Sequence, residues 1–451
     1  MKILLLSPIL RHSGGKPKNT HQPPLALAYL AANLLKHGHE VKIVDFYSEE
    51  LWKKRKKLIG GYRPDIVGVS AKTTAYLEAV DLVKKAKEFG LLTVIGGPHP
   101  TATPETVLKT APVDALFIGE AEETFAEFAD NLAQKKKDFS INGVVRIIRG
   151  KAFWPTQTWP KPVDLDKIPF PARHLLDNVY TPYIDSKDGR IDAEAMIASR
   201  GCLGICSFCH VKGRSGWTGR SIKLVVEEMS LLLEQSRKQG IYFNDLFLAG
   251  SKEWTVRLCK EILKRRLKVF WTCETRVDNF DKELASYMAK AGCVRASFGV
   301  ETLNDNLLKG VNKQTSVEQI EKAVKNASRS GILPYLQMII GLPGETKTTI
   351  NQTTGLLDKW IEKYGIYVAG FGPLWLYPGT ALFQKFGDQQ HDWLRTVSSG
   401  TIFPNVPLYS PPTLSQGFVV KTCRDLTEKY RKLIAQKYPI SYKDITDYEI
   451  Y

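Results

Sequence analysis

The sequence predicts an α/β protein with an N-terminal Rossmann-like domain, whose parallel sheet is doubly wound and flavodoxin-like. A partial (β/α)6 barrel of the TIM-barrel type and a short C-terminal region follow. Three observations predict this class: short apolar runs alternate with amphipathic stretches over residues 1–385, a proline-rich stretch interrupts the alternation, and 43% of the 451 residues are hydrophobic. The expected limits are 1–140 for the first domain, 141–185 for a linker, 186–385 for the barrel and 386–451 for a helical C-terminal region.

Charge and hydropathy limit the kinds of partner. Lysine and arginine number 63 and aspartate and glutamate 47, a formal net charge of +16 that favours acidic partners. The densest basic run, residues 53–57, is expected to be a solvated helix face. No apolar stretch approaches the roughly 20 residues of a membrane helix, and the opening MKILLLSPIL is expected to be a strand rather than a signal peptide. We expect a cytoplasmic protein and no nucleic-acid partner.

Five apolar, β-rich runs near the N-terminus are expected to form a parallel sheet that is buried on both faces. They cover residues 2–9, 40–46, 65–71, 92–98 and 114–120. The amphipathic stretches between them are expected to be helices, at 24–37, 75–89, 104–110 and 122–134. Gly38 and Gly90 stand where a left-handed residue would end two of these helices.

Small or polar residues follow these strands, at the sheet edge where ligands bind in such folds. They include Asp45, Ser70, the pair Gly96 and Gly97, and Gly119 with Glu120. Paired glycines allow the backbone to approach a phosphate or a flat ring closely. Neither G-x-G-x-x-G nor G-x-x-x-x-G-K-[ST] occurs in this third of the chain, which excludes dinucleotide and ATP phosphate loops.

Five prolines between Trp154 and Arg173 predict an extended connector. After it, six strands with helical stretches between them predict a barrel whose site lies at the C-terminal strand ends. The strands are expected at 193–199, 242–248, 269–275, 294–300, 334–340 and 367–376. A helical stripe that begins at Ile222 is expected to end at Gly240, and Thr315 with Glu318 is expected to form a capping box.

Three of the seven cysteines, Cys202, Cys206 and Cys209, lie within eight residues just after the first barrel strand. In a reducing cytosol such a group indicates a metal site rather than disulfides. A structural zinc ion needs a fourth ligand, and His210 adjoins Cys209 too closely to serve without strain. Three thiolates alone fit an iron–sulfur cubane with one open corner, and a non-catalytic zinc protein is the remote alternative.

The run Ser199-Arg200-Gly201-Cys202-Leu203-Gly204-Ile205-Cys206-Ser207-Phe208-Cys209 resembles the signature of the radical S-adenosylmethionine (SAM) superfamily. The resemblance implies that the three cysteines are the catalytic, metal-binding ligands of a 4Fe–4S cluster and that SAM binds the fourth iron. It also implies SAM contacts along the barrel strand ends. These are Phe208, Asn244, Asp245, Arg276, Ser297, Glu301, Gly341, Leu342 and Pro343. A carboxylate suits the ammonium group of SAM, and an arginine suits its carboxylate.

The order of Rossmann-like domain, linker and barrel resembles the cobalamin-binding class of this superfamily, as do residues 23–31, 67–70, 96–101, 119–122 and 168–173. This resemblance implies a cobalamin site on the N-terminal strand ends. Its residues are Pro24, Ser70, Thr73, Gly96, Gly97, His99, Gly119 and Glu120. The D-x-H-x-x-G motif, which supplies a cobalt ligand in other cobalamin proteins, is absent and only His12 lies near that loop. The absence implies cobalt without a protein histidine.

As a member of this class, the chain is expected to methylate an unactivated carbon through a 5′-deoxyadenosyl radical and methylcobalamin. The alternative is a radical SAM enzyme with a vestigial Rossmann domain that couples carbons, cyclises or dehydrogenates. A tRNA methylthiotransferase would carry three further cysteines before Cys202, and an auxiliary-cluster enzyme would have a cysteine-rich C-terminus; neither pattern occurs.

The expected electron donor is a flavodoxin or ferredoxin. The expected substrate is a small molecule, a lipid or a peptide, and a lipid substrate together with the basic surplus would imply peripheral membrane association. Residues 386–451 are expected to contribute to the substrate site.

Overall fold

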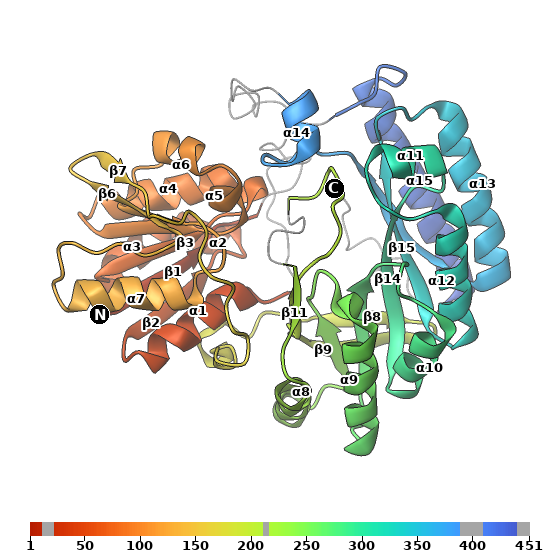
Figure 1. Ribbon diagram of the computed structural model, residues 1–451, viewed down its shortest axis with the longest axis horizontal. Coiled ribbons are helices and arrows are strands. Elements are labelled where there is room, and N and C mark those ends of the chain that lie inside the picture. The colour runs from red at the N-terminus through yellow and green to blue at the C-terminus, as the bar shows by residue number, and fades with distance from the viewer. Residues whose placement is uncertain (11–21, 211–215, 388–408, 440–451) are drawn as a thin grey trace. The chain divides into compact units, whose positions relative to one another are not determined.

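The computed structural model describes residues 1–10, 22–210, 216–387 and 409–439 (Figure 1). The chain divides into two compact units, one formed mainly by Met1–Tyr180 and the other mainly by Thr181–Leu376 with the C-terminal helix. Each unit contains a seven-stranded sheet with its own hydrophobic core. Among the described residues, no helix is both long and apolar enough to cross a membrane.

The first unit contains the predicted parallel sheet. Its strands are β1 (Lys2–Ser7), β2 (Glu40–Asp45), β3 (Ile66–Ser70), β4 (Leu92–Gly96) and β5 (Ala115–Phe117). They pair in the order β2-β1-β3-β4-β5, which is the flavodoxin-like order and confirms the predicted fold class.

Two strands that the sequence analysis did not predict extend this sheet. β6 (Val144–Ile148) and β7 (Lys151–Phe153) pair antiparallel beyond β5. Every residue of β7 is exposed. An exposed edge strand needs no apolar alternation, so its sequence resembles that of a linker.

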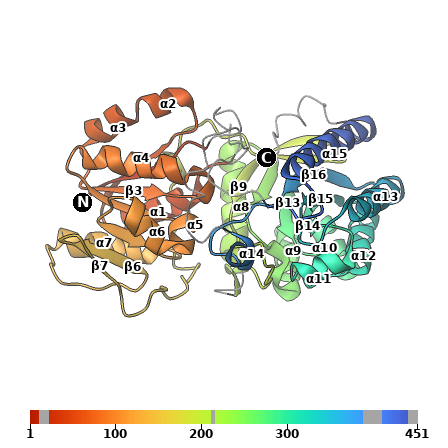
Figure 2. The same ribbon diagram turned by 90° about the horizontal axis from the view of Figure 1, so that it is seen from above.

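Helices cover both faces of this sheet because successive residues of a strand point to opposite sides. Ile3 packs with the helices on one face and Leu4 with those on the other. The first face carries α1 (Leu25–Lys36) and α7 (Glu122–Ala133). The second carries α2 (Glu49–Lys53), α3 (Arg55–Tyr62) and α4 (Tyr76–Lys87), which lie together in Figure 2, and it is also covered by α6 (Pro104–Thr110). Shorter helical segments are η1 (Thr73–Ala75), α5 (Pro98–Ala102) and η2 (Arg173–Leu175).

The basic run is a helix surface, as predicted. Lys54 pairs with Glu50, Arg55 with Asp81 and Lys56 with Glu88. Because three of its cations already have carboxylate partners, this run offers less net charge to an anionic surface than its sequence suggests.

The second unit is a curled half-barrel of six parallel strands, which confirms the predicted partial barrel. The strands are β9 (Gly189–Met196), β12 (Gly240–Phe243), β13 (Phe270–Thr275), β14 (Cys293–Glu301), β15 (Leu333–Ile340) and β16 (Tyr367–Pro373). An unpredicted strand, β8 (Tyr183–Ser186), pairs antiparallel with β9 at the edge.

Helices cover the outer face of the half-barrel (Figure 1). They are α8 (Ile222–Ser236), η3 (Leu248–Gly250), α9 (Lys252–Lys264), α10 (Lys282–Lys290), α11 (Asp305–Gly310), α12 (Val317–Arg329) and α13 (Lys347–Tyr364). Outward-facing residues such as Trp271, Phe298 and Leu336 are fully buried beneath them. The inner face is polar, where Arg295 donates to Thr272 and lies against the ring of Tyr335.

Three local predictions are wrong. The capping box of α12 consists of Ser316 and Gln319, one residue beyond the predicted pair Thr315 and Glu318, because the helix begins one residue later. α8 ends at Ser236 with left-handed Arg237, and Gly240 begins β12 instead of ending the helix. The strand expected at 242–248 is also misplaced, because β12 ends at Phe243. The apolar stretch from there to Leu248 is a loop and a 3-10 turn whose residues fill the core.

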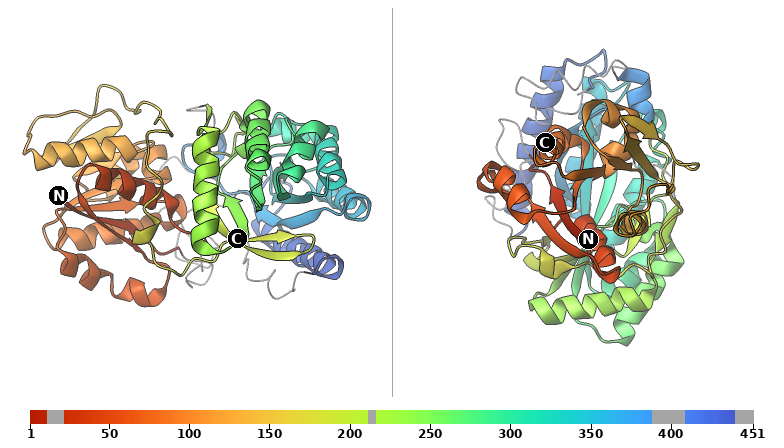
Figure 3. Two further views of the ribbon diagram at one scale, coloured as in Figure 1. Left: turned by 90° about the horizontal axis from the view of Figure 1, so that it is seen from below. Right: turned by 90° about the vertical axis from the view of Figure 1, so that its left-hand side faces the viewer.

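The described part of the C-terminal region contains α15 (Gln416–Lys437), which packs on β16 (Figure 3). Thr427 accepts a hydrogen bond from the backbone of Phe371 at 2.9 Å, and Tyr430 lies beside the Phe371 ring. Earlier in the chain, between β16 and α15, lies α14 (Ala381–Phe386). The aromatic residues Phe371, Trp375 and Phe383 are buried core, whereas Trp393 and Phe403 lie outside the described residues.

Candidate functional site

The three clustered cysteines lie on a loop that a small antiparallel ladder closes. β10 (Ser199–Gly201) precedes the loop and pairs with β11 (Trp217–Gly219). Gly201 has φ +87°, and a Cβ there would collide with the carbonyl oxygen of Gly216. Only glycine therefore allows the two ends of this cysteine loop to approach so closely.

All seven cysteines are free thiols. Cys206 is buried, and Cys202 and Cys209 are half-buried. The backbone of Gly204 donates to Sγ of Cys202 at 3.3 Å, and that of Cys209 to the carbonyl of Cys206 at 3.1 Å. Within the described ranges, no three His, Cys, Asp or Glu side chains are already gathered around a metal position. The donor set nevertheless fits an iron–sulfur cluster, because it consists of three soft sulfur donors on one loop.

The other four cysteines belong to the core. Burial raises the pKa of Cys259 to about 12, and the hydrogen bond that the Cys273 thiol makes to Cys293, together with burial, raises the pKa of Cys273. Neutral buried thiols are poor metal ligands, which agrees with the prediction that only the clustered three bind metal.

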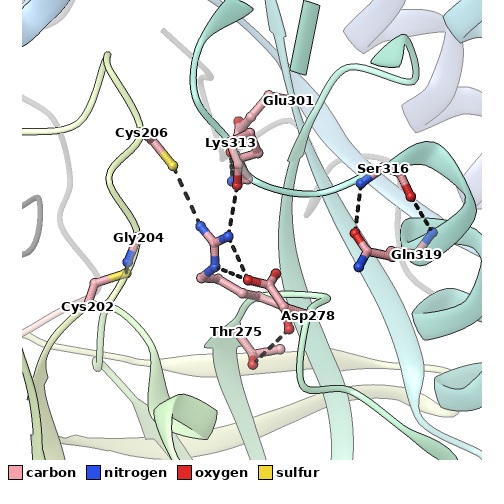
Figure 4. A network of polar contacts seen from close by, with 10 residues as sticks. Cys202, Gly204, Cys206, Thr275, Asp278, Glu301, Lys313, Ser316 and Gln319 are labelled. Atoms are coloured by element: carbon pink, nitrogen blue, oxygen red, sulfur yellow. Dashed lines mark hydrogen bonds and ion pairs between the residues drawn. The ribbon is translucent and has the colours of Figure 1, made fainter. Parts of the chain in front are cut away.

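Arg276 follows β13 and joins three segments around this loop. Figure 4 shows its partners Cys206, Asp278 and Lys313. Its Nε and Nη2 donate to Oδ2 of Asp278 at 2.9 and 2.7 Å, and Nη2 also donates to the carbonyl of Lys313 at 2.8 Å. Its Nη1 lies 3.6 Å from Sγ of Cys206. Burial alone would lower the pKa of Arg276, but Asp278 and the nearby cysteines raise it above its ordinary value. The guanidinium is therefore a fixed cation beside the cysteine loop.

Glu301 and Lys313 form a buried ion pair at 2.6 Å next to Arg276. Glu301 is left-handed (φ +69°) and follows an irregularity in the pairing of β14 with β15, a strained position of the kind that occurs at functional sites. Lys313 stands between left-handed Asn312 and Gln314, and its Nζ lies 5.9 Å from the ring centre of half-buried Phe208. The sequence analysis did not identify Lys313 or Asp278. Each is one charged residue in a charged loop, and only the fold brings it to the cysteines.

Asp245 is fully engaged at the base of the cysteine loop. Its carboxylate accepts hydrogen bonds from the backbone of Ala198 and Ser199 and, at 2.5 Å, from the Ser199 hydroxyl. Burial raises the pKa of Asp245 to about 7. The half-buried Asn244 beside it donates its backbone N–H to Met196 at the end of β9. These two residues tie the second barrel strand to the first.

The turn of Gly341, Leu342 and Pro343 follows β15. Glu345 accepts hydrogen bonds from the backbone N–H groups of Gly341 and Leu342, at 2.5 and 3.3 Å. Burial raises the pKa of Glu345 to about 7. The carbonyl of Glu345 accepts a hydrogen bond from Thr413 in the C-terminal region. The backbone N–H groups of Gly341 and Leu342 are therefore used within the turn.

Ser297 lies on the inner face of the half-barrel, beside Glu274 of the neighbouring strand. Burial raises the pKa of Glu274, which accepts a hydrogen bond from Gln337 at 3.1 Å. Of the predicted SAM contacts, the structure gathers Phe208, Arg276 and Glu301 around the cysteine loop. Asn244 and Asp245 lie at its base, and Ser297 and the turn after β15 lie on the adjoining strands.

The predicted cobalamin residues all lie at the carboxyl ends of the first sheet. Half-buried members are Pro24, Ser70, Gly96, Gly97, Gly119 and Glu120. Gly97 has φ +106°, and a Cβ there would lie 2.9 Å from the carbonyl oxygen of Ala71. This glycine is required by the contact of two backbone segments inside the domain.

His99 is completely buried, between Thr73 at 3.2 Å and Thr103 at 3.3 Å, and its ring packs on Tyr76. Burial lowers the pKa of His99 to about 3, so the ring is neutral. His37 and His39 pair with Asp130 at the opposite end of the sheet. His99 is therefore enclosed by its neighbours, and His37 and His39 lie away from the carboxyl strand ends; His12 lies outside the described residues.

The fold and this loop define a radical SAM domain joined to a B12-binding domain. The family model of the B12 binding domain matches residues 18–129, and that of the Radical SAM superfamily matches residues 196–357. An uncharacterized methyltransferase of Pyrococcus horikoshii is 33% identical over 393 residues, which cover 85% of this chain and 83% of that protein. An anaerobic magnesium-protoporphyrin IX monomethyl ester cyclase of Rubrivivax gelatinosus is 31% identical over 403 residues, covering 86% and 70%.

Solved structures show the same fold. The radical SAM methyltransferase TsrM from Kitasatospora setae, with cobalamin and a [4Fe-4S] cluster bound, has a TM-score of 0.71 at 20% identity and covers 94% of this chain and 90% of that chain. The cobalamin-dependent radical SAM enzyme OxsB has a TM-score of 0.72 at 18% identity, covering 94% and 66%. The chain belongs to the family of cobalamin-dependent radical SAM enzymes. The predicted family, enzyme class, fold and cofactor set are thereby confirmed.

Proposed function

We propose that this enzyme methylates an unactivated carbon of a small organic molecule. The observation that carries the proposal is the loop with three free thiols, one of them facing a fixed arginine, in a chain that also has the B12-type sheet. When bound, the cluster and SAM supply an organic radical, and cobalamin carries a methyl group.

The residues of the second unit are proposed to bind the cluster and SAM. Cys202, Cys206 and Cys209 are proposed to hold the cluster, and Glu301 is proposed to accept the ammonium group of SAM. Its present partner, Lys313, shows that this buried carboxylate binds an ammonium group at 2.6 Å. Phe208, Asn244, Ser297 and the turn of Gly341, Leu342 and Pro343 are proposed to contact the rest of SAM.

The strand ends of the first unit are proposed to hold cobalamin. Pro24, Ser70, Gly96, Gly119 and Glu120 would provide the contact surface, because they are small or half-buried there. Thr73, Gly97 and His99 are proposed to support that surface from below, since Thr73 and His99 are buried and bonded to each other. The limits 1–140, 141–185, 186–385 and 386–451 are proposed as functional regions.

The test uses anaerobically reconstituted full-length protein with cobalamin, dithionite and SAM that is labelled in its methyl group. We expect 5′-deoxyadenosine, and label in a candidate acceptor from a panel of small molecules, lipids and peptides. Cys206→Ala should form no 5′-deoxyadenosine, whereas Cys259→Ala, which alters a core thiol, should retain it. Formation of 5′-deoxyadenosine by Cys206→Ala would refute the assignment.

A second candidate, oxidative ring closure, is favoured by the 31% identity to the Rubrivivax gelatinosus cyclase. The same assay separates the two functions. A cyclase would consume SAM and form 5′-deoxyadenosine without transferring the labelled methyl group, and magnesium-protoporphyrin IX monomethyl ester is the first substrate to try.

The cluster needs an electron donor, which dithionite replaces in the assay. We propose that this donor is a flavodoxin or ferredoxin. We also propose a cytoplasmic location, where thiols stay reduced. A lipid substrate with peripheral membrane binding has weaker support, since the densest basic run is largely paired.

A further inference from the structure

We infer that Arg276 is a positioning residue of the cysteine loop, which holds the sulfur of Cys206 in place and stabilises the negative charge of the cluster, and that it does not clamp the carboxylate of SAM. The inference rests on the proposed role of the three cysteines as cluster ligands. It revises the role that the resemblance alone would give to this arginine.

The guanidinium is oriented by groups outside the loop. Asp278 accepts from both Nε and Nη2, and the carbonyl of Lys313 accepts from Nη2. A guanidinium that is held at two of its three nitrogens cannot rotate without breaking charge-assisted bonds. Its third nitrogen, Nη1, is consequently fixed in direction, toward Cys206.

The cysteine loop is shaped to receive this nitrogen. A Cβ on Gly204 would lie 2.7 Å from Nη1 of Arg276, so the glycine between Cys202 and Cys206 makes room for the guanidinium. Ser207 fastens the loop to the segment that binds the other side of Arg276, since its N–H and hydroxyl both contact the carbonyl of Val311, at 2.9 and 3.1 Å. Arg276 and Cys206 are both buried, which strengthens the interaction between them.

Counting donors separates this role from a SAM clamp. A guanidinium has five N–H donors. Nε gives one to Asp278, Nη2 gives one each to Asp278 and Lys313, and Nη1 gives one to Cys206, so one N–H on Nη1 is left. A bidentate grip on a carboxylate needs two adjacent donors, and Arg276 could supply them only by releasing one of its present partners.

The charge of Arg276 has a measurable consequence. Hydrogen bonds and positive charge at cluster sulfurs favour the reduced, more negative state and so raise the reduction potential. Side chains that orient metal ligands also affect retention of the metal, typically by about 10- to 100-fold when they are removed.

The experiment compares full-length wild type with Arg276→Met, Arg276→Lys and Asp278→Asn after anaerobic reconstitution. Arg265→Met is the matched control, because Arg265 is an exposed arginine of the same unit that pairs with Glu261. Iron and sulfide per chain, the rate of iron loss to a chelator, the midpoint potential of the cluster and the affinity for SAM are measured.

We expect Arg276→Met to lose iron about tenfold faster and to have a more negative midpoint potential. Arg276→Lys keeps the positive charge but lacks the planar guanidinium with its paired N–H donors. It should therefore restore the midpoint potential of the cluster more fully than the retention of iron. Asp278→Asn should fall between wild type and Arg276→Met, and Arg265→Met should match wild type. Should Arg276→Met not fold, the lysine and Asp278 variants decide the question.

Wild-type retention and potential in Arg276→Met, with loss of SAM affinity alone, would overturn the inference and restore the role as a SAM clamp. Absence of iron and sulfide from wild type would instead overturn the proposed cluster ligands, and this inference with them.

Discussion

Single buried carboxylates hold the strand-end loops of the second unit in place. Glu345 binds the backbone of its own turn, and Asp245 binds the backbone that leads into the cysteine loop. Burial raises the pKa of both to about 7. The resemblance to the radical SAM superfamily identified Asp245, but the sequence did not predict its partners Ala198 and Ser199, because hydrogen-bond partners far apart in sequence depend on the packing of separate strands.

Glu345→Gln tests the carboxyl of the turn. The pKa of Glu345 is raised in the fold from its ordinary 4.5 to about 7, so its contribution to stability is complete below about pH 4.5 and is lost as the pH rises through 7. Glutamine keeps the accepting oxygen without the charge. We therefore expect the variant to gain on the order of 2 kcal/mol over wild type between pH 5 and pH 8, measured by urea unfolding. An equal difference at both pH values would show that Glu345 does not titrate in this range.

At the scale of elements, a few glycines determine how closely loops can pack on strands. Gly201 closes the cysteine loop, and Gly204 admits the guanidinium of Arg276. The sequence predicted most helices and strands within a few residues, because buried strands and amphipathic helices have distinct periods. It missed the edge strands β7 and β8, and β6, which pairs with β7. It also shifted β12, because core residues continue beyond the end of that strand.

Gly201→Ala tests the closure of the cysteine loop. The new methyl group would collide with the backbone of Gly216, and φ +87° disfavours alanine as well. We expect a loss of about 2 kcal/mol or more in the free energy of unfolding and a lower iron content after reconstitution. The control is Gly355→Ala, in an exposed and open position of α13, which should gain about 0.5–1 kcal/mol. A fully stable Gly201→Ala would show that the loop can close otherwise.

At the scale of the whole molecule, one buried group of the first unit and two of the second are of opposite kinds. The first unit buries His99 neutral, and the second buries the carboxyl groups of Asp245 and Glu345. Burial disfavours the charged form in each case, but a histidine is charged at low pH and a carboxyl group at high pH. The contributions of His99 and of these two carboxyl groups to stability should therefore respond to pH in opposite directions.

The pKa of His99 falls in the fold from 6.5 to about 3, so its contribution to stability is present above pH 6.5 and is lost as the pH falls toward 3. We expect hydrogen exchange of β4 and α5 to accelerate, relative to intrinsic rates, from pH 7 to pH 5. Exchange of β15 and α13 should accelerate, on the same relative scale, from pH 6 to pH 8. His99→Gln should remove most of the acceleration in β4 and α5 and leave that in β15 and α13 unchanged. If exchange in both units changed with pH in the same direction, these pKa directions would be contradicted.

The sequence by itself determined the family, the group of three clustered cysteines and the two α/β units, because these depend on residue types at short spacing and on local hydrophobic period. The tertiary structure alone decided which charges meet at the cysteine loop. Arg276 with Asp278, Glu301 and Lys313 belong to three separate segments of the chain, and Cys206 lies 70 residues before Arg276. A contact across such a separation exists only because parallel strands bring their carboxyl ends to one edge, and no local pattern in the sequence records it.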